Sequence, residues 1–83
     1  MTSYLQRFKN LERIGTSFDG VDKCYAVQAG REIRIIVNPK KTSDDDSHEL
    51  ARQVARKIED ELQYPGHIRV TIIRENRFVE YAK

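Results

Sequence analysis

The chain has little cysteine and no long apolar run. Cys24 is the single cysteine among 83 residues, so no intramolecular disulfide can form, whereas secreted domains of this size usually carry several bridges. No stretch approaches the ~20 consecutive apolar residues of a transmembrane helix, and the first residues lack the apolar core of a signal peptide. These absences favour a soluble domain from a reducing compartment.

The chain also lacks a strong charge of either sign. Lysine and arginine number 15 and aspartate and glutamate 13, so the formal net charge is +2. This balance permits contact with RNA or an acidic surface but creates no field that would dictate such a partner. Because 83 residues leave room for one small domain, a separate catalytic half is excluded, and we expect no deep enclosed active site.

Two segments have the spacing of amphipathic helices. Apolar residues recur at steps of three and four from Ser3 to about Gly15. The stronger pattern follows the acidic triplet 44–46, where Asp46 and Glu49 have the spacing of a capping box. Its apolar stripe consists of Leu50, Val54, Ile58 and Leu62. Tyr64-Pro65-Gly66 is predicted to end this second helix.

Short runs of β-type residues at 25–29, 32–37 and 68–73 predict three strands. Gly30-Arg31 separates the first two runs by a spacing suited to a tight antiparallel hairpin. Residues 78–81 are expected to form a short edge strand or a packed arm.

The predicted order is therefore α-β-β-α-β, with that short strand as an optional sixth element. It indicates a two-layer α+β fold in which helices cover a three- to four-stranded, mostly antiparallel sheet. We expect residues 1–18 to be a leading helix that continues from an upstream domain, and residues 19–83 to form the α+β domain.

Catalytic constellations are sparse. His48 and His67 have no cysteine or histidine neighbour, and the acidic triplet 44–46 lacks the ligand spacing of a calcium loop. Cys24 has only Lys23 beside it to favour a thiolate, so a partly buried thiol is the better interpretation. We predict no catalytic, cofactor-binding or metal-binding residue in this chain.

Basic residues on the predicted strands and their ends form a candidate contact surface. Arginines that alternate with aromatic residues on a sheet can hold single-stranded RNA by phosphate contacts and base stacking. The alternative is a solvated face on which Glu32, Glu75 and Glu80 pair with these arginines, each pair contributing little. The candidate contacts to RNA or a partner are Arg31, Arg34, Lys40, Lys41, Arg69, Arg74 and Arg77, with Tyr25, Phe78 and Tyr81 among them.

Several irregular segments agree in order and spacing with one protein family. They are the run YAVQAGREIRI from Tyr25 to Ile35, Tyr64-Pro65-Gly66, the run IRVTIIRE from Ile68 to Glu75, Arg77, and the residues from Val79 to Lys83. Together they resemble the C-terminal domain of ribonuclease Y, the piece that follows the HD domain. Cys24, Asn76 and Phe78 depart from the residues more usual in that family.

The resemblance implies a bacterial, membrane-anchored endoribonuclease that initiates mRNA decay by cleaving single-stranded RNA. In that family an N-terminal anchor, a coiled coil and a KH RNA-binding domain precede an HD domain, which holds divalent metal and hydrolyses the phosphodiester. This chain has no His-Asp doublet and no GXXG loop, so the family's catalytic, metal and KH residues have no counterparts in it.

The resemblance therefore places the parent at the cytoplasmic side of the cell membrane, with this piece making no membrane contact itself. We expect the chain to be a fragment that is inactive alone and holds no cofactor, while the parent's HD domain binds metal. Its expected role is packing on the HD domain of the same chain, homodimer formation or partner contact. The alternative is an RNA-binding module that presents substrate to the HD domain.

Overall fold

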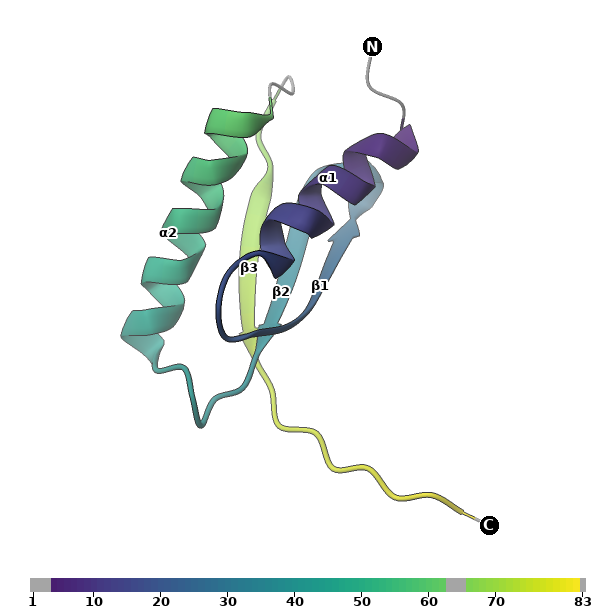
Figure 1. The fold of residues 1–83 in the computed structure, drawn as a ribbon, viewed down its shortest axis with the longest axis vertical. Helices are drawn as coiled ribbons and strands as arrows, with labels where there is room; N and C mark the ends of the chain where they lie inside the picture. The colour runs from purple at the N-terminus through teal and green to yellow at the C-terminus, as the bar shows by residue number, and fades with distance from the viewer. Residues whose placement is uncertain (1–3, 63–65, 83) are drawn as a thin grey trace.

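A computed structural model describes residues 4–62 and 66–82, with the side chains of residues 4 and 5 excepted. Its elements are α1 (Tyr4–Thr16), β1 (Val21–Val27), the 3₁₀ turn η1 (Gln28–Gly30), β2 (Glu32–Val37), α2 (Asp44–Glu61) and β3 (Arg69–Arg74). Figure 1 shows their arrangement. The order α-β-β-α-β agrees with the prediction. The predicted helix start at Ser3, the apolar side chains of Tyr4 and Leu5, and the helix stop at Tyr64-Pro65 lie outside what is described.

Helix α2 begins at Asp44, three residues before the start that a capping box of Asp46 with Glu49 would give. Ser43 is the N-cap, and its Oγ accepts a hydrogen bond of 3.1 Å from the backbone N–H of Asp46. In return the Asp46 carboxylate accepts the N–H of Ser43 at 3.3 Å. The predicted pairing of Asp46 with Glu49 is therefore wrong, because Asp46 is the third helical residue and not the cap. Three aspartates in the first turn further stabilise the positive end of the helix.

The three strands form a mixed sheet in the order β1-β2-β3. Strands β1 and β2 are antiparallel, whereas β2 and β3 are parallel, so the sheet is not mostly antiparallel. The parallel pair follows from the connection through α2, because adjacent parallel strands require a crossover and cannot be joined by a tight turn. Residues 75–82 continue from β3 without strand assignment, so the optional final strand is not formed.

The connection between β1 and β2 is longer than the predicted two-residue turn. Strand β1 ends at Val27, and the 3₁₀ turn closes through a 3.1 Å hydrogen bond from Arg31 N–H to Gln28 O. Both Gln28 and Ala29 adopt positive φ, 52° and 60°, which is uncommon for residues with a Cβ. The residue types of Gln28 and Ala29 do not predict this conformation, because only glycine adopts it at low cost.

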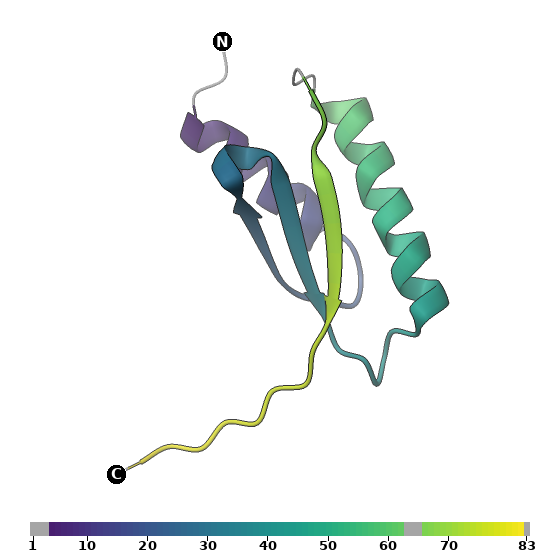
Figure 2. The same ribbon diagram turned by 180° about the vertical axis from the view of Figure 1, so that it is seen from behind.

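The hydrophobic core lies on one face of the sheet. Ile33, Ile35 and Val37 of β2 are fully buried there, as are Leu11 and Ile14 of α1. Figure 2, seen from behind, shows the strands in front of α1. Helix α1 thus belongs to the same core as the strands, while its continuation into an upstream domain stays a prediction.

Candidate functional site

The uncovered face of the sheet carries several of the predicted contact residues. Residues paired across neighbouring strands point to the same face, so the register defines three rows on it. The rows are Val27, Glu32 and Arg69; Tyr25, Arg34 and Thr71; and Lys23, Ile36 and Ile73. Arginine and tyrosine side chains therefore stand side by side, as the sequence predicted for a sheet surface.

A buried carboxylate lies at one end of this face, at the first residue of β2. Glu32 is 3% exposed, and its Oε2 accepts hydrogen bonds from Thr71 Oγ1 at 2.9 Å and Arg34 Nε at 3.2 Å. Its Oε1 accepts one from Gln28 Nε2 at 3.2 Å. The Thr71 hydrogen bond, with smaller contributions from Arg34 and Arg69, lowers the pKa of Glu32 against the opposing effect of burial. Ionised Glu32 thus joins the η1 turn, β2 and β3.

Three of the seven predicted contact residues are ion-paired with carboxylates. The pairs are Arg34 with Glu32 (Nε–Oε2 3.2 Å), Arg77 with Glu75 (Nε–Oε2 2.9 Å), and Arg74 with Asp44. Glu75, followed by a hydrogen bond to Tyr25, raises the pKa of Arg77. Glu32 and Glu75 thus pair with arginines, although Glu32 is buried and not solvated.

The other four predicted contacts lie at the ends of β2 and β3. Arg31 follows η1, Arg69 opens β3, and Lys40 and Lys41 lie in the turn after β2; all four are exposed. Within residues 4–62 and 66–82, no ion pair joins any of them to a carboxylate. Arg31 and Arg69 thus lie at the start of the parallel pair β2–β3, whereas Lys40 and Lys41 lie beyond its other end.

Two of the seven come together where the chain leaves β3. Lys40 and Arg77 line a cavity of about 380 Å³ together with Lys23, and Phe78 lies at its rim, 92% exposed. Asp22 and Glu75 line it as well, so its charges are mixed. Lys23 is not among the predicted contacts, because the sequence predicts that the first strand begins at residue 25. Its start at Val21 puts Lys23 on the sheet.

The thiol of Cys24 faces α1 on the core side of the sheet. It is half-buried and packs against the core, next to Gly15. Burial, with a smaller contribution from Glu12, raises the pKa of Cys24 to about 11. A thiol with this pKa is almost entirely protonated at neutral pH and is a poor nucleophile. The partly buried interpretation of Cys24 is confirmed.

The two histidines stand apart on the surface. His48 is exposed in the first turns of α2, and His67 is exposed just before β3. In the part of the chain that the structure describes, no three His, Cys, Asp or Glu side chains converge as a metal site requires. Over the same residues, no helix combines the length and apolar character needed to cross a membrane.

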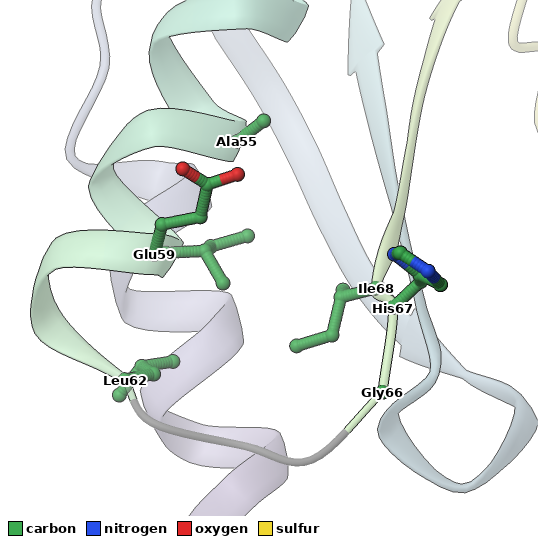
Figure 3. Close-up of a pocket in the computed structure, with 7 residues that line it drawn as sticks. Ala55, Glu59, Leu62, Gly66, His67 and Ile68 are labelled. Carbon is green, nitrogen blue, oxygen red and sulfur yellow. The ribbon is translucent and has the colours of Figure 1, made fainter.

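A second cavity lies between the end of α2 and the start of β3 (Figure 3). Its volume is about 310 Å³, and its apolar lining comes from Ala55, Ile58, Leu62 and Ile68. Ile68 points from the strand toward the helix, and Glu59 and His67 are the polar residues at the rim.

Known proteins match the chain from its first residue to its last. It is 59% identical to ribonuclease Y of Fusobacterium nucleatum, 57% identical to that of Treponema denticola and 55% identical to that of Enterococcus faecalis, with all 83 residues aligned in each comparison. The whole chain is homologous to ribonuclease Y. It spans 16% of the length of each of these relatives, which is consistent with a C-terminal fragment of ribonuclease Y. No family model matches the chain, and no solved structure matches it.

Proposed function

We propose that this chain is a non-catalytic accessory domain of a ribonuclease Y. The parent is a bacterial, membrane-anchored endoribonuclease that initiates mRNA decay by cutting single-stranded RNA, with divalent metal in its HD domain. The observation that carries the proposal is the match itself: every residue aligns at 54–59% identity, yet the chain makes up only 16% of the relatives. The domain serves packing on the HD domain, dimerisation or partner contact.

The chemistry of the described side chains supports a non-catalytic role. The nucleophile candidate, Cys24, has its pKa raised to about 11. Glu32, a carboxylate buried in the sheet, has both oxygens occupied by hydrogen bonds from its own neighbours, so it has a structural role. Neither group is arranged to transfer a proton to or from a phosphodiester.

The surface supports a role in contact. Phe78, Val79 and Tyr81 are 92%, 65% and 85% exposed, although large apolar side chains seldom gather in the open on a soluble domain. All three lie in the extended residues that follow β3. A segment of this kind gains stability when a partner covers it.

Removal of these 83 residues from full-length ribonuclease Y tests the proposal. We expect the shortened enzyme to retain metal-dependent cleavage of a short unstructured RNA within about threefold, because the reacting groups lie elsewhere. We also expect its assembly state, measured by sedimentation, to change. The full-length Arg56→Lys variant is the control, since Arg56 is exposed on α2. Complete loss of cleavage by a folded shortened enzyme would refute the proposal.

A second candidate function is RNA binding, and one observation favours it. Lys23, Lys40 and Arg77 line one cavity beside exposed Phe78, a combination that can hold a phosphate and stack a base. Titration of the domain with a short RNA in low salt, followed by NMR, tests it. Salt-sensitive shifts at this cavity that are lost in Lys40→Gln, and retained in Arg56→Gln on α2, would support RNA binding. No shifts would reject it.

A further inference from the structure

A third cavity lies where two loops meet the beginning of α2. Its volume is about 370 Å³. The turn after α1 contributes Asp19 and Gly20 to its lining, and the loop after β2 contributes Lys41 and Thr42. The loop between α1 and β1 and the start of α2 lie at the same end of the molecule (Figure 1). These segments are distant in sequence, so the fold itself assembles the cavity.

Thr42 is a polar residue that is buried at this cavity. It is 8% exposed, and its Oγ1 lies 3.7 Å from the place that a Cβ on Gly20 would take, so the hydroxyl faces another residue of the lining. The backbone N–H of Thr42 donates a hydrogen bond of 3.0 Å to Asn38 O. Over residues 4–62 and 66–82, however, the hydroxyl makes no hydrogen bond with another protein group. It is therefore available to a group that enters the cavity.

An unpaired hydroxyl at a buried position reduces the stability of the fold, because it gives up hydrogen bonds to water and gains none in return. Valine has the shape of threonine without this loss. Thr71 shows the usual arrangement, since its hydroxyl donates to Glu32 Oε2 at 2.9 Å. Residues that break such a rule are expected chiefly at functional sites, so Thr42 points to a ligand.

Two carboxylates at the cavity have no cationic partner. In the part of the chain that the structure describes, neither Asp19 nor Asp46 forms an ion pair. Asp46 Oδ2 accepts the N–H of Ser43 at 3.3 Å, and among the described residues its Oδ1 accepts no hydrogen bond. Both carboxylates can therefore accept further N–H groups.

The lining is negative, in contrast to the chain as a whole. It contains three carboxylates, those of Asp19, Asp46 and Glu49, and one ammonium, that of Lys41, so its formal charge is −2. The whole chain carries +2. Neighbours on α2 already donate hydrogen bonds to Glu49, so the charge open to a ligand is that of Asp19 and Asp46.

These features select an organic cation. A metal ion needs several ligands that converge on it, and no three His, Cys, Asp or Glu side chains do so in the described residues. Ammonium and guanidinium groups carry three and five N–H donors and no acceptor, which suits a cavity that is negative and rich in acceptors. Leu50, which also lines the cavity, offers an apolar surface to the alkyl stem of such a cation.

We propose that this cavity binds an alkyl ammonium or alkyl guanidinium group. Asp19 and Asp46 pair with its charge, and the Thr42 hydroxyl accepts one of its N–H groups. Two sources present this chemistry: a lysine or arginine side chain of a partner protein, and a free polyamine. The inference goes beyond the proposed accessory role, because it assigns a site that does not involve the uncovered face of the sheet.

Titration of the 83-residue chain, followed by NMR, tests the proposal with three ligands at equal ionic strength. They are a Gly-Arg-Gly peptide with blocked ends, spermidine and Mg²⁺. We expect saturable shifts at residues 19–20, 41–42 and 46–53 with at least one of the organic cations, and smaller shifts with Mg²⁺. Shifts with the peptide alone assign the site to a partner's side chain, and tighter binding of spermidine assigns it to a polyamine.

Substitutions in the lining should change the affinity in both directions. Thr42→Val and Asp19→Asn should each weaken binding at least fivefold. Lys41→Gln should strengthen binding, because it removes the ammonium that opposes the ligand. Thr42→Val should at the same time raise the urea midpoint of the chain without ligand, since the unpaired hydroxyl is gone. Because Asp19 is exposed, its variant keeps the test valid if circular dichroism shows Thr42→Val to be unfolded.

Two substitutions are matched controls. Asp45→Asn removes the same charge from the first turn of α2, but Asp45 does not line the cavity, so the affinity should change less than twofold. Thr71→Val removes a hydroxyl that has a partner, so it should lower the urea midpoint and leave the affinity unchanged.

Three results would overturn the proposal. They are the absence of saturable shifts at the cavity with both organic cations, equal weakening by Asp45→Asn and Asp19→Asn, and wild-type affinity in folded Thr42→Val. None of these measurements depends on RNA cleavage or on assembly of the parent, so failure here leaves the accessory role standing.

Discussion

The Thr71 hydroxyl donates a hydrogen bond of 2.9 Å to Glu32 Oε2 across the parallel pair β2–β3. These residues are 39 positions apart in sequence, and α2 lies between them in the chain. The bond therefore ties the return of the chain after α2 to the η1 turn, which Gln28 joins to the same carboxylate. It acts on the uncovered face, opposite the hydrophobic core.

The Glu32 carboxylate makes stability depend on acid pH. Its pKa in the folded chain lies below the ordinary value of 4.5, so the unfolded chain binds a proton more readily. The resulting stabilisation is present above about pH 4.5 and is lost as the pH falls through the folded pKa. In Glu32→Gln, urea unfolding should show lower stability at pH 7 and a shallower decline between pH 5 and 3 than in wild type.

Glu49 provides the control for this effect. Hydrogen bonds from Arg52 and then Gln53 lower its pKa too, but the carboxylate is exposed on α2. Glu49→Gln should therefore change the stability at pH 7 much less than Glu32→Gln. Equal effects of the two substitutions would show that the buried network has no special role.

The close contact of α1 with β1 requires Gly15. A Cβ at this position would overlap Cys24 Sγ and lie 3.1 Å from Ile33 Cδ1. Overpacking costs about 1–3 kcal/mol, and a helix gains about 1 kcal/mol when alanine replaces glycine. We expect Gly15→Ala to lose about 1 kcal/mol in chemical unfolding.

Truncation of the facing thiol should reverse that loss. In a Cys24→Ala background the overlapping sulfur is gone, so Gly15→Ala should be neutral or stabilising. Measurement of both single variants and the double variant forms a mutant cycle. An additive cycle would contradict the contact between Gly15 and Cys24.

The Cys24 thiol should react slowly at neutral pH. A pKa of about 11 in place of 9.0 reduces the thiolate fraction about 100-fold at pH 7. Alkylation followed by mass spectrometry should be at least that much slower in the folded chain than in urea-unfolded chain. Equal rates in the two states would mean that the thiol is neither buried nor protected.

The start of α2 provides a test of the capping box. Ser43→Ala removes the side-chain acceptor for the Asp46 N–H and should cost about 1 kcal/mol. Replacement of Glu49, which the sequence had paired with Asp46, should cost clearly less. If urea unfolding showed a larger loss of stability for Glu49→Ala than for Ser43→Ala, the capping box of Ser43 and Asp46 would be contradicted.

The sequence predicted both helices because the apolar residues of each recur at a helical period and face the core of the folded chain. The stripe of Leu50, Val54 and Ile58 is buried as expected. The start of β1 was not predicted, because the charged residues Asp22 and Lys23 interrupt the apolar pattern of a strand. The residues of this edge strand that pack against the core, Val21, Cys24 and Ala26, are only partly buried. The β1–β2 turn was also wrong, because Gln28 and Ala29 hold positive φ that their residue types do not reveal.

The candidate surface was predicted in part. The arginines do lie on the sheet and at its ends. Residue type alone could not show that Arg34, Arg74 and Arg77 form ion pairs with neighbouring carboxylates. The burial of Glu32 could not be predicted either, because its hydrogen-bond donors come from three separate elements of the fold. The cavity between the end of α2 and the start of β3 depends on the parallel pairing of β2 with β3, which a mostly antiparallel sheet did not predict.

We propose that this domain serves a ribonuclease Y without performing its chemistry. The most direct measurement is cleavage of a labelled single-stranded RNA by the purified 83-residue chain, beside full-length ribonuclease Y in the same buffer with Mg²⁺ or Mn²⁺. The full-length enzyme should cut the RNA, and the isolated chain should leave it intact at every concentration tested. Metal-dependent cleavage that co-purifies with the folded 83-residue chain and is lost on its unfolding would contradict the claim.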